Sequence, residues 1–200
     1  PVRLLKPCLT VLQELAHSYG CSVVLCTATQ PAFDRRDKFS IGLEGVREIM
    51  PEPEKLYLSM KRVDVRYVGP RLDEQLSTEL AARPQVLCVV NTRPHAARVF
   101  EQLLEKSNDP DGTFHLSTFM CGAHRSVVIA TIRARLVEGK TCRVVSTQLI
   151  EAGVDIDFPV VFRALAGIDS IAQAAGRCNR EGRLDRGEVY VFEPTDVKLY

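Results

Sequence analysis

The chain has 200 residues, of which 46% are hydrophobic and 26% charged, and its formal net charge is +1. This composition allows a substantial buried core, and the small net charge excludes a protein that coats nucleic acid through a generally basic surface, while local basic patches remain available. No run of about 18 apolar residues occurs, and the start is not basic and then apolar, so neither a membrane span nor a signal peptide is indicated. We therefore expect a cytoplasmic chain without membrane contact.

Cysteine and histidine spacing gives no sign of a metal site. The seven cysteines lie mostly in apolar runs such as CSVVLC and VLCVV, where they act as small buried hydrophobes, and no CxxC pair occurs. No histidine adjoins an aspartate. We expect the four histidines to be surface or structural residues, with one, His115, also a candidate contact to nucleic acid.

The first 60 residues predict one helix, one strand and a linker. An apolar stripe from Leu5 to Ala16 indicates an amphipathic helix that ends at Gly20, and the apolar residues 22–27 predict a buried strand. Prolines, glycines and the charged run DRRDK interrupt residues 30–60. These residues are typical of a linker, with one short helix at most.

From Val63 onward, short apolar strands alternate with amphipathic helices. Such alternation predicts a doubly wound α/β fold, with a mostly parallel sheet covered by helices on both faces. The predicted strands are 63–68, 86–90, one near 114, 143–146, 160–164 and 188–192. Two predicted helices start near residues 73 and 93, and two more cover residues 124–136 and 170–177.

Polar side chains follow these strands, where parallel sheets usually place their sites. Each alone can be a helix cap, but together they predict a composite site that suits phosphate. Gly153 permits close backbone approach and Asp155 offers a carboxylate. The other residues of this set are Asn91, Thr92, His115, Ser117, Thr118 and Thr147, followed by the helix that carries Gln173.

The stretch QAAGRCNREGR places Gln173, Arg177 and Arg180 at i, i+4 and i+7, beside Gly176. On a continuous helix these three side chains share one face. The two guanidinium groups then require an anionic partner, either a carboxylate or a phosphate.

Four segments in order resemble helicase motifs. TAT (27–29), VVNT (89–92), STQLIEAGVDID (146–157) and QAAGRCNR (173–180) are similar to motifs III, IV, V and VI of superfamily 2 helicases. The wording LCTATQP, IEAGVDIDFPVVFR and DSIAQAAGRCNREG resembles the CRISPR-associated helicase-nuclease of type I interference systems. The resemblance covers nearly the whole chain, most tightly 86–192, and it implies a RecA-like lobe. Cys178 and Asn179 depart from relatives that have glycine there.

Two further segments imitate nucleotide-binding motifs. ARLVEGKT (134–141) fits a permissive P-loop pattern, but a predicted helix precedes it and a strand follows, which is the reverse of the P-loop order. We predict that Gly139 ends that helix, with Lys140 near its negative end. LDEQ (72–75) opens a helix instead of closing a strand, so it is predicted to supply an N-cap and a first-turn acid.

The resemblance implies a division of the chain. Residues 1–29 would be the end of a first RecA-like lobe, reduced to a helix and a strand without its sheet, residues 30–60 the inter-lobe linker, and 61–200 the second lobe. ATP and Mg²⁺ would then bind in the full-length parent. We expect no tightly bound cofactor and no ATPase activity in this chain alone.

The resemblance also implies roles for individual residues. Gln173, Arg177 and Arg180 would belong to motif VI, with the arginines reaching the γ-phosphate and Arg180 in the arginine-finger position. Gly153, Asp155 and Gly176 would lie near the nucleotide. Contacts to the DNA backbone would come from Asn91, Thr92, His115, Ser117, Thr118 and Thr147, and coupling to lobe closure from Thr27 and Thr29.

The implied partners are single-stranded DNA, an RNA-guided CRISPR surveillance complex, and the first helicase lobe and nuclease domain of the parent. Two alternatives stay open from the residues alone. One is the second lobe of another superfamily 2 helicase that acts on RNA or DNA. The other is a non-enzymatic Rossmann-like binding module, although no G-x-G-x-x-G follows an early strand.

Overall fold

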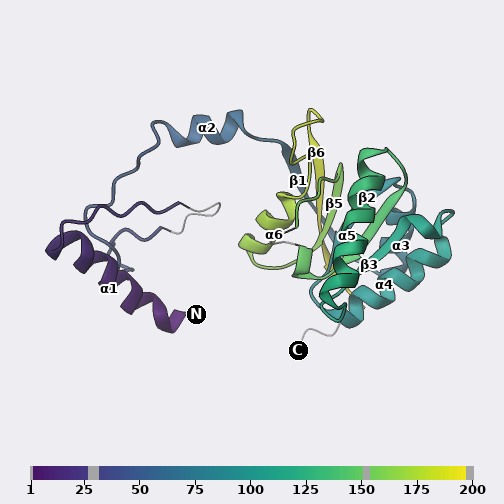
Figure 1. The fold of residues 1–200 in the computed structure, drawn as a ribbon, viewed down its shortest axis with the longest axis horizontal. Coiled ribbons are helices and arrows are strands. Elements are labelled where there is room, and N and C mark those ends of the chain that lie inside the picture. Colours follow the sequence, from purple (N-terminus) through teal and green to yellow (C-terminus); the bar gives the residue numbers. More distant parts are fainter. Residues whose placement is uncertain (1, 27–31, 151–153, 197–200) are drawn as a thin grey trace. The chain divides into compact units, whose positions relative to one another are not determined.

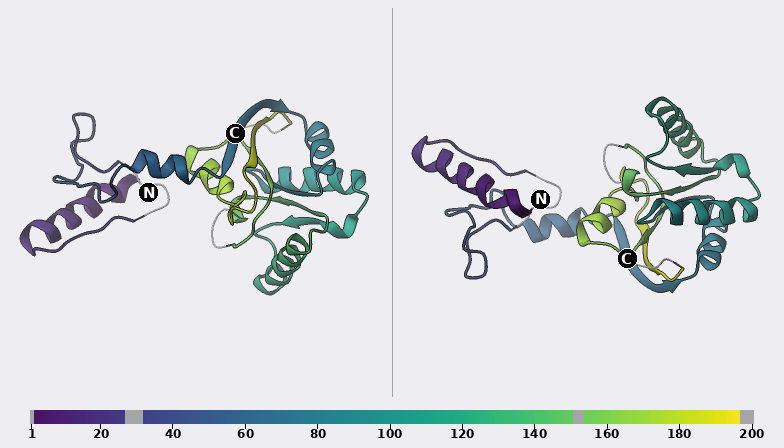
Figure 2. Two further views of the ribbon diagram at one scale, coloured as in Figure 1. Left: turned by 90° about the horizontal axis from the view of Figure 1, so that it is seen from above. Right: turned by 90° about the horizontal axis from the view of Figure 1, so that it is seen from below.

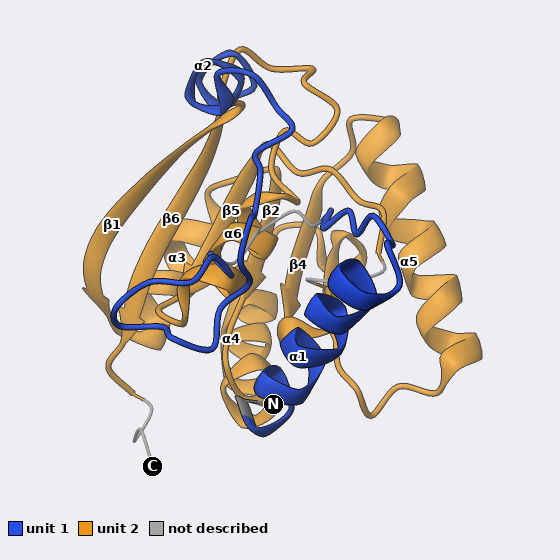
Figure 3. Ribbon diagram, turned by 90° about the vertical axis from the view of Figure 1, so that its left-hand side faces the viewer, with its two compact units in different colours: residues 1–60 blue, residues 61–200 orange. Residues whose placement is uncertain are grey.

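The computed structural model describes residues 2–26, 32–150 and 154–196 of the chain. The chain divides into two compact units, Pro1–Met60 and Lys61–Tyr200, which are coloured separately in Figure 3. Among the described helices, none combines the length and apolarity that crossing a bilayer requires.

The described residues of the first unit include the helices α1 (Val2–Ser18) and α2 (Pro53–Ser59). Gly20 follows α1 with a left-handed φ of 62°, and the next residue, Cys21, donates its N–H to the carbonyl of Leu15. The predicted helix end is thereby confirmed, because glycine adopts positive φ without a Cβ clash. The single short helix expected in the linker is α2.

The strand predicted at residues 22–27 is wrong for its described part. Residues 22–26 form no strand, and Val24 is 68% exposed. An apolar run forms a ladder only when another strand accepts its backbone hydrogen bonds. Apart from that run, the β structure in the described part of this unit consists of isolated bridges, such as Asp34 with Leu43.

The second unit is built on one six-stranded sheet in which all neighbours pair parallel, in the order β1-β6-β5-β2-β4-β3 (Figure 1). This order confirms the predicted doubly wound α/β class, because parallel neighbours need crossover connections. The strands are β1 (Val63–Arg71), β2 (Gln85–Val89), β3 (Thr113–Leu116), β4 (Cys142–Ser146), β5 (Val160–Ala164) and β6 (Gly187–Pro194).

Helices cover both faces of this sheet, as the two views of Figure 2 show. Successive residues of a strand point to opposite faces, so β2 contributes Leu87 and Val89 to one core cluster and Val86 and Cys88 to the other. Helices α5 (Gly122–Val137) and α6 (Ile168–Ala175) pack on the first cluster, and α3 (Asp73–Ala81) and α4 (Arg93–Lys106) on the second.

The segment 134–141, which fits a permissive P-loop pattern, has the predicted helix-then-strand structure. Helix α5 ends just before Gly139, whose φ is 68°, and strand β4 follows. Gly139 and Lys140 donate their N–H groups to the carbonyls of Leu136 and Arg135, which satisfies the last acceptors of the helix. No helix N-terminus faces this loop, so it lacks the phosphate cradle of a P-loop.

The second imitation, LDEQ, has a larger structural role than a cap. Leu72 takes the cap position of α3 and Asp73 is an acid of its first turn, as predicted for this segment. The Asp73 carboxylate is buried, accepts a hydrogen bond from His95 Nε2 at 2.8 Å and pairs with Arg98 Nε at 3.2 Å. Burial lowers the pKa of His95, although the neighbouring Asp73 carboxylate acts in the opposite direction. The contact between Asp73 and His95 connects α3 to α4.

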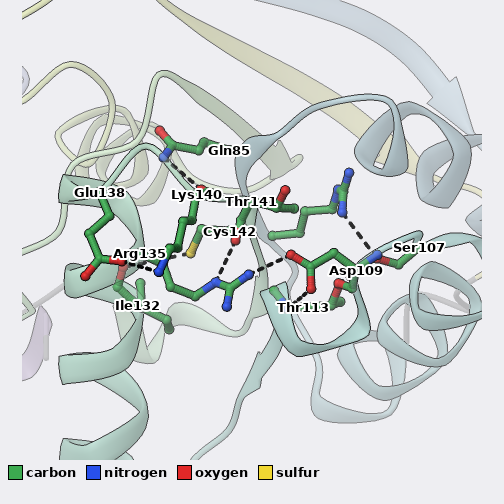
Figure 4. A network of polar contacts seen from close by, with 12 residues as sticks. Gln85, Ser107, Asp109, Thr113, Ile132, Arg135, Glu138, Lys140, Thr141 and Cys142 are labelled. Carbon is green, nitrogen blue, oxygen red and sulfur yellow. Dashed lines mark hydrogen bonds and ion pairs between the residues drawn. The ribbon is translucent and has the colours of Figure 1, made fainter.

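A polar network closes the edge where β2, β3 and β4 begin (Figure 4). Arg135 of α5 pairs with Asp109 at 2.6 Å and donates to the carbonyl of Thr141 at 2.8 Å. Gly112, in the short helix η1 (Pro110–Gly112), fits against all three residues, because a Cβ there would lie within 2.8 Å of one atom of each. The network therefore fixes the starts of β3 and β4.

We predict that residues 61–200 fold without the preceding 60. Both core clusters draw only on residues of the second unit, so deletion of 1–60 removes no core side chain. Thermal unfolding of the truncated chain should give a cooperative transition with a midpoint within a few degrees of the intact chain. A non-cooperative transition, or loss of the fold, would contradict this prediction.

Candidate functional site

Polar residues lie together where β2, β4 and β3 end, and we call this line of strand ends the carboxyl edge. Because these three strands are neighbours in the sheet, the residues that follow them form a row. Asn91 and Thr92 follow β2, Thr147 follows β4, and Ser117 and Thr118 follow β3. This part of the predicted composite site is assembled by the fold.

Asn91 stabilises the backbone conformation of the carboxyl edge. Its Oδ1 accepts a hydrogen bond from Arg163 Nη1 at 2.6 Å, and its Nδ2 donates to the carbonyl of Leu165 at 2.8 Å. Both ends of the carboxamide are therefore engaged with the end of β5. These bonds give Asn91 a positioning role, and its contact to DNA stays a prediction.

Arg163, the partner of Asn91, was missed by sequence reasoning. It lies in β5 and is fully buried, although charged side chains almost never are unless they are paired. The signal was present in the sequence, since VVFRA places one arginine inside an otherwise apolar strand.

The hydroxyls of the carboxyl edge differ in exposure. Thr92 and Thr118 are exposed, and Thr92 Oγ1 accepts the N–H of His95 at 3.4 Å, which confirms it as the N-cap of α4. Ser117 and Thr147 are buried, and Ser117 Oγ accepts the N–H of Phe119 at 3.3 Å. Solvent therefore reaches the first two hydroxyls best.

His115 is packed under α4. Its ring stacks on Phe100 with centroids 5.4 Å apart, and its buried Nε2 has no hydrogen-bond partner among the described residues. Burial lowers the pKa of this imidazole, which is therefore neutral at pH 7. This placement argues against the nucleic-acid contact expected for His115.

The arginines of QAAGRCNR do not share one helix face. Helix α6 ends at Ala175 with Gly176 as its C-cap, so Arg177 and Arg180 lie beyond it, whereas Gln173 is exposed within it. The chain then turns, and Cys178 forms an isolated parallel bridge with Phe158. The i, i+4, i+7 expectation is corrected because the helix stops before the second residue of the set.

The Phe158 bridge places Arg180 at the opposite edge of the sheet, which we call the amino edge. Phe158 precedes β5, and Asp155 lies nearby in the same approach to that strand. Arg180 Nε pairs with Asp155 Oδ1 at 3.3 Å, and the Arg180 N–H donates to Asp157 Oδ1 at 2.7 Å. The expectation that Asp155 lies at the strand ends with the threonines is therefore wrong.

Arg177 and Arg180 differ in their surroundings. Arg177 Nε donates to the carbonyl of Ile150 at 3.1 Å, and burial lowers its pKa, with a further contribution from the positive charge of Arg180. The side chains of Arg180 and Asp155 are 45% and 72% exposed. Such an open pair contributes little stability, so a stronger anion can replace the carboxylate.

The departure at Cys178 and Asn179 has a structural reason. Asn179 adopts a left-handed φ of 46°, which asparagine tolerates better than most residues, and its buried amide bonds Arg62 and Leu184. Cys178 packs against Gly187, where a Cβ would lie 2.5 Å from its sulfur. Burial raises the pKa of the Cys178 thiol to about 12.

A cavity of about 320 Å³ opens at the amino edge. Asp155 and Asn179 line it together with Arg133 and Glu181. Asp155 therefore faces both Arg180 and this space. Of the remaining predicted site residues, Gly176 is exposed beside Arg177, while Gly153, Thr27 and Thr29 lie outside the described residues.

Comparison with known proteins identifies the family. Residues 82–183 match the model of the C-terminal part of the CRISPR-associated nuclease/helicase Cas3. The chain belongs to this family. The resemblance drawn from its motifs is thereby confirmed, and the chain is a CRISPR-associated helicase lobe. Family membership favours this assignment over the two alternatives left open by the residues.

Relatives of Cas3 share the fold over much of the chain. This chain is 29% identical to the Cas3 nuclease/helicase of Methanothermobacter thermautotrophicus, in an alignment that spans 196 residues and covers 92% of this chain. A crystal structure of a CRISPR-associated protein aligns with 95% of the chain, at a TM-score of 0.60 and 23% identity. A CRISPR RNA-guided surveillance complex before nicking has a similar chain, with a TM-score of 0.51, 24% identity and 68% coverage. The chain spans 23%, 23% and 19% of these proteins.

We predict that Asn179 is required for the geometry after α6. Asn179→Ala removes three hydrogen bonds and leaves a residue at positive φ without the polar side chain that favours this conformation, so it should lower the free energy of unfolding by about 2–4 kcal/mol. Asn179→Gly keeps the backbone freedom and should cost less. Urea denaturation of both variants tests this order, and a larger loss for glycine would contradict it.

Proposed function

We propose that residues 61–200 form the second RecA-like lobe of an ATP-dependent single-stranded DNA translocase in type I CRISPR interference. The observation that supports this proposal is that two sets of groups able to bind phosphate lie at opposite edges of one sheet. Exposed hydroxyls and the start of α4 lie at the carboxyl edge, and the exposed Arg180 lies at the amino edge. A translocase needs one set for DNA and another for ATP.

At the amino edge, Arg180 acts as the arginine finger. Its planar guanidinium exchanges Asp155 for the γ-phosphate and stabilises the charge that develops there, while the half-buried Arg177 adds positive charge beside it. Bound ATP and Mg²⁺ supply the phosphoryl group and its electrostatic activation. This chain contributes one wall of that site, so we expect no ATP hydrolysis by the chain alone.

At the carboxyl edge, the lobe holds the DNA backbone. Thr92 and Thr118 offer exposed hydroxyls that can donate hydrogen bonds to a phosphate. Asn91 and the buried Ser117 and Thr147 keep these donors in place. Backbone contacts of this kind are independent of sequence, as translocation along DNA requires.

The turn after β5 and the helix α6 that follows it connect the two edges. Asn91 at the carboxyl edge bonds the carbonyl of Leu165, and the chain then enters α6 and reaches Arg177 and Arg180. A shift of the DNA-binding turn therefore moves the helix that precedes the arginines. We place the RNA-guided surveillance complex, the first lobe and the nuclease domain as partners of the parent protein.

The arginine finger is tested by substitution in the full-length parent. Arg180→Ala should lower kcat for DNA-stimulated ATP hydrolysis by about 10³ or more, because its main interaction forms in the transition state. KM should change much less. Arg180→Lys should restore little, since an ammonium cannot reproduce the bidentate fork.

The matched control for this series is Arg183→Ala. Arg183 is another exposed arginine in the same loop, paired with Glu181 instead of Asp155. It should leave kcat within a few-fold of the wild type. Equal losses for both arginines, or an intact kcat after Arg180→Ala, would contradict the finger assignment.

The DNA edge is tested by binding of labelled single-stranded DNA to the parent. Thr92→Ala and Thr118→Ala should each weaken binding several-fold, because each removes a hydroxyl donor to phosphate. Arg180→Ala should leave the Kd within a few-fold. Thr131→Ala, which changes an exposed threonine of α5 that donates only to its own helix, serves as the control. Weaker binding by the control or by Arg180→Ala alone would overturn the assignment.

A further inference from the structure

Phe119 stands out in the turn that follows β3. Phe119 is 79% exposed, although burial of a phenyl ring would stabilise the fold by about 1.5–3 kcal/mol. It lies next to Thr118 at the carboxyl edge, the edge already assigned to DNA. None of the roles assigned above uses this ring.

The turn that carries Phe119 is ordered by its own contacts. Ser117 Oγ accepts the N–H of Phe119 at 3.3 Å, and the Ser117 carbonyl accepts the N–H of Met120 at 3.1 Å. Ser117 is buried, and Met120 packs against the core cluster under α5. The ring is therefore presented to solvent from a fixed backbone, and little freedom remains to be lost on binding.

Arg93 holds one face of the ring. Its guanidinium carbon lies 4.1 Å from the ring centroid, which is a cation–π contact between the first residue of α4 and the turn after β3. This contact spans the end of β4, which separates β2 from β3 in the sheet. Since Phe119 remains largely exposed, its second face is open.

The surroundings of the open face suit nucleic acid better than protein. The Arg93 charge lies over the ring, and the exposed Thr92 and Thr118 adjoin Arg93 and Phe119 in the chain, so the neighbourhood is polar and positive. Protein hot spots are instead set in apolar patches that exclude water. An aromatic ring beside phosphate donors is the combination that binds single strands, by stacking a base while the backbone is held.

We propose that Phe119 is a stacking platform for one unpaired nucleobase of single-stranded DNA. Arg93 supports the ring from behind and neutralises a neighbouring phosphate. This inference rests on the proposed function, because it places the strand along the carboxyl edge. Stacking adds affinity for any base, so it suits a protein that moves along DNA regardless of sequence.

The test compares two probes on the full-length parent. One is an oligothymidylate of about 12 nucleotides, and the other is an abasic strand with the same number of phosphates. The wild type should bind the thymidylate more tightly. Phe119→Ala should weaken thymidylate binding by about tenfold and leave abasic binding unchanged, whereas Phe119→Trp should retain the preference. Arg93→Ala should weaken both and reduce the salt dependence.

Tyr67→Ala is the control, since Tyr67 is a 60% exposed aromatic on β1, at the far side of the sheet from β3. An unchanged thymidylate preference in Phe119→Ala overturns the platform while the proposed function stands. Equal weakening of both probes also overturns it, because loss of a stack cannot act on an abasic strand. Absence of DNA binding by the wild type overturns both proposals.

Discussion

Parallel pairing of the six strands decides which side chains can meet in this lobe. Because every strand points the same way, residues that follow β2, β3 and β4 gather at one edge, and those that precede β5 gather at the other. The partly buried bond between Arg163 and Asn91 stabilises one edge, and the Arg135–Asp109 pair stabilises the other. The DNA and nucleotide assignments both depend on this polarity.

Helix α6 relates the two edges to each other. It begins after Leu165, whose carbonyl Asn91 binds at the carboxyl edge, and the chain beyond it reaches Arg180 at the amino edge. The turn beyond it needs a left-handed residue, which Asn179 supplies together with three hydrogen bonds. A lobe of this kind can thus transmit a change at the DNA edge to the arginines through one short helix.

Hydrophobic periodicity was sufficient to predict the position of the strands and main helices of residues 61–200, because most of these elements bury one face. Periodicity failed where tertiary contacts determine the local structure. The apolar residues 22–26 have no ladder partner, and helix α6 stops before Arg177 because the chain there turns to pair with Phe158. Periodicity also cannot tell that Arg163 is paired with Asn91 or that the His115 ring is packed against Phe100.

Hydrogen exchange of the full-length parent tests the central claim, that DNA and ATP occupy opposite edges of one sheet. Single-stranded DNA alone should slow amide exchange in residues 91–96 and 117–121. A non-hydrolysable ATP analogue alone should slow exchange in residues 154–158 and 177–182, where Asp157 already binds the N–H groups of Arg180 and Glu181. Protection of 177–182 by DNA alone, or of 91–96 by the analogue alone, would contradict the claim.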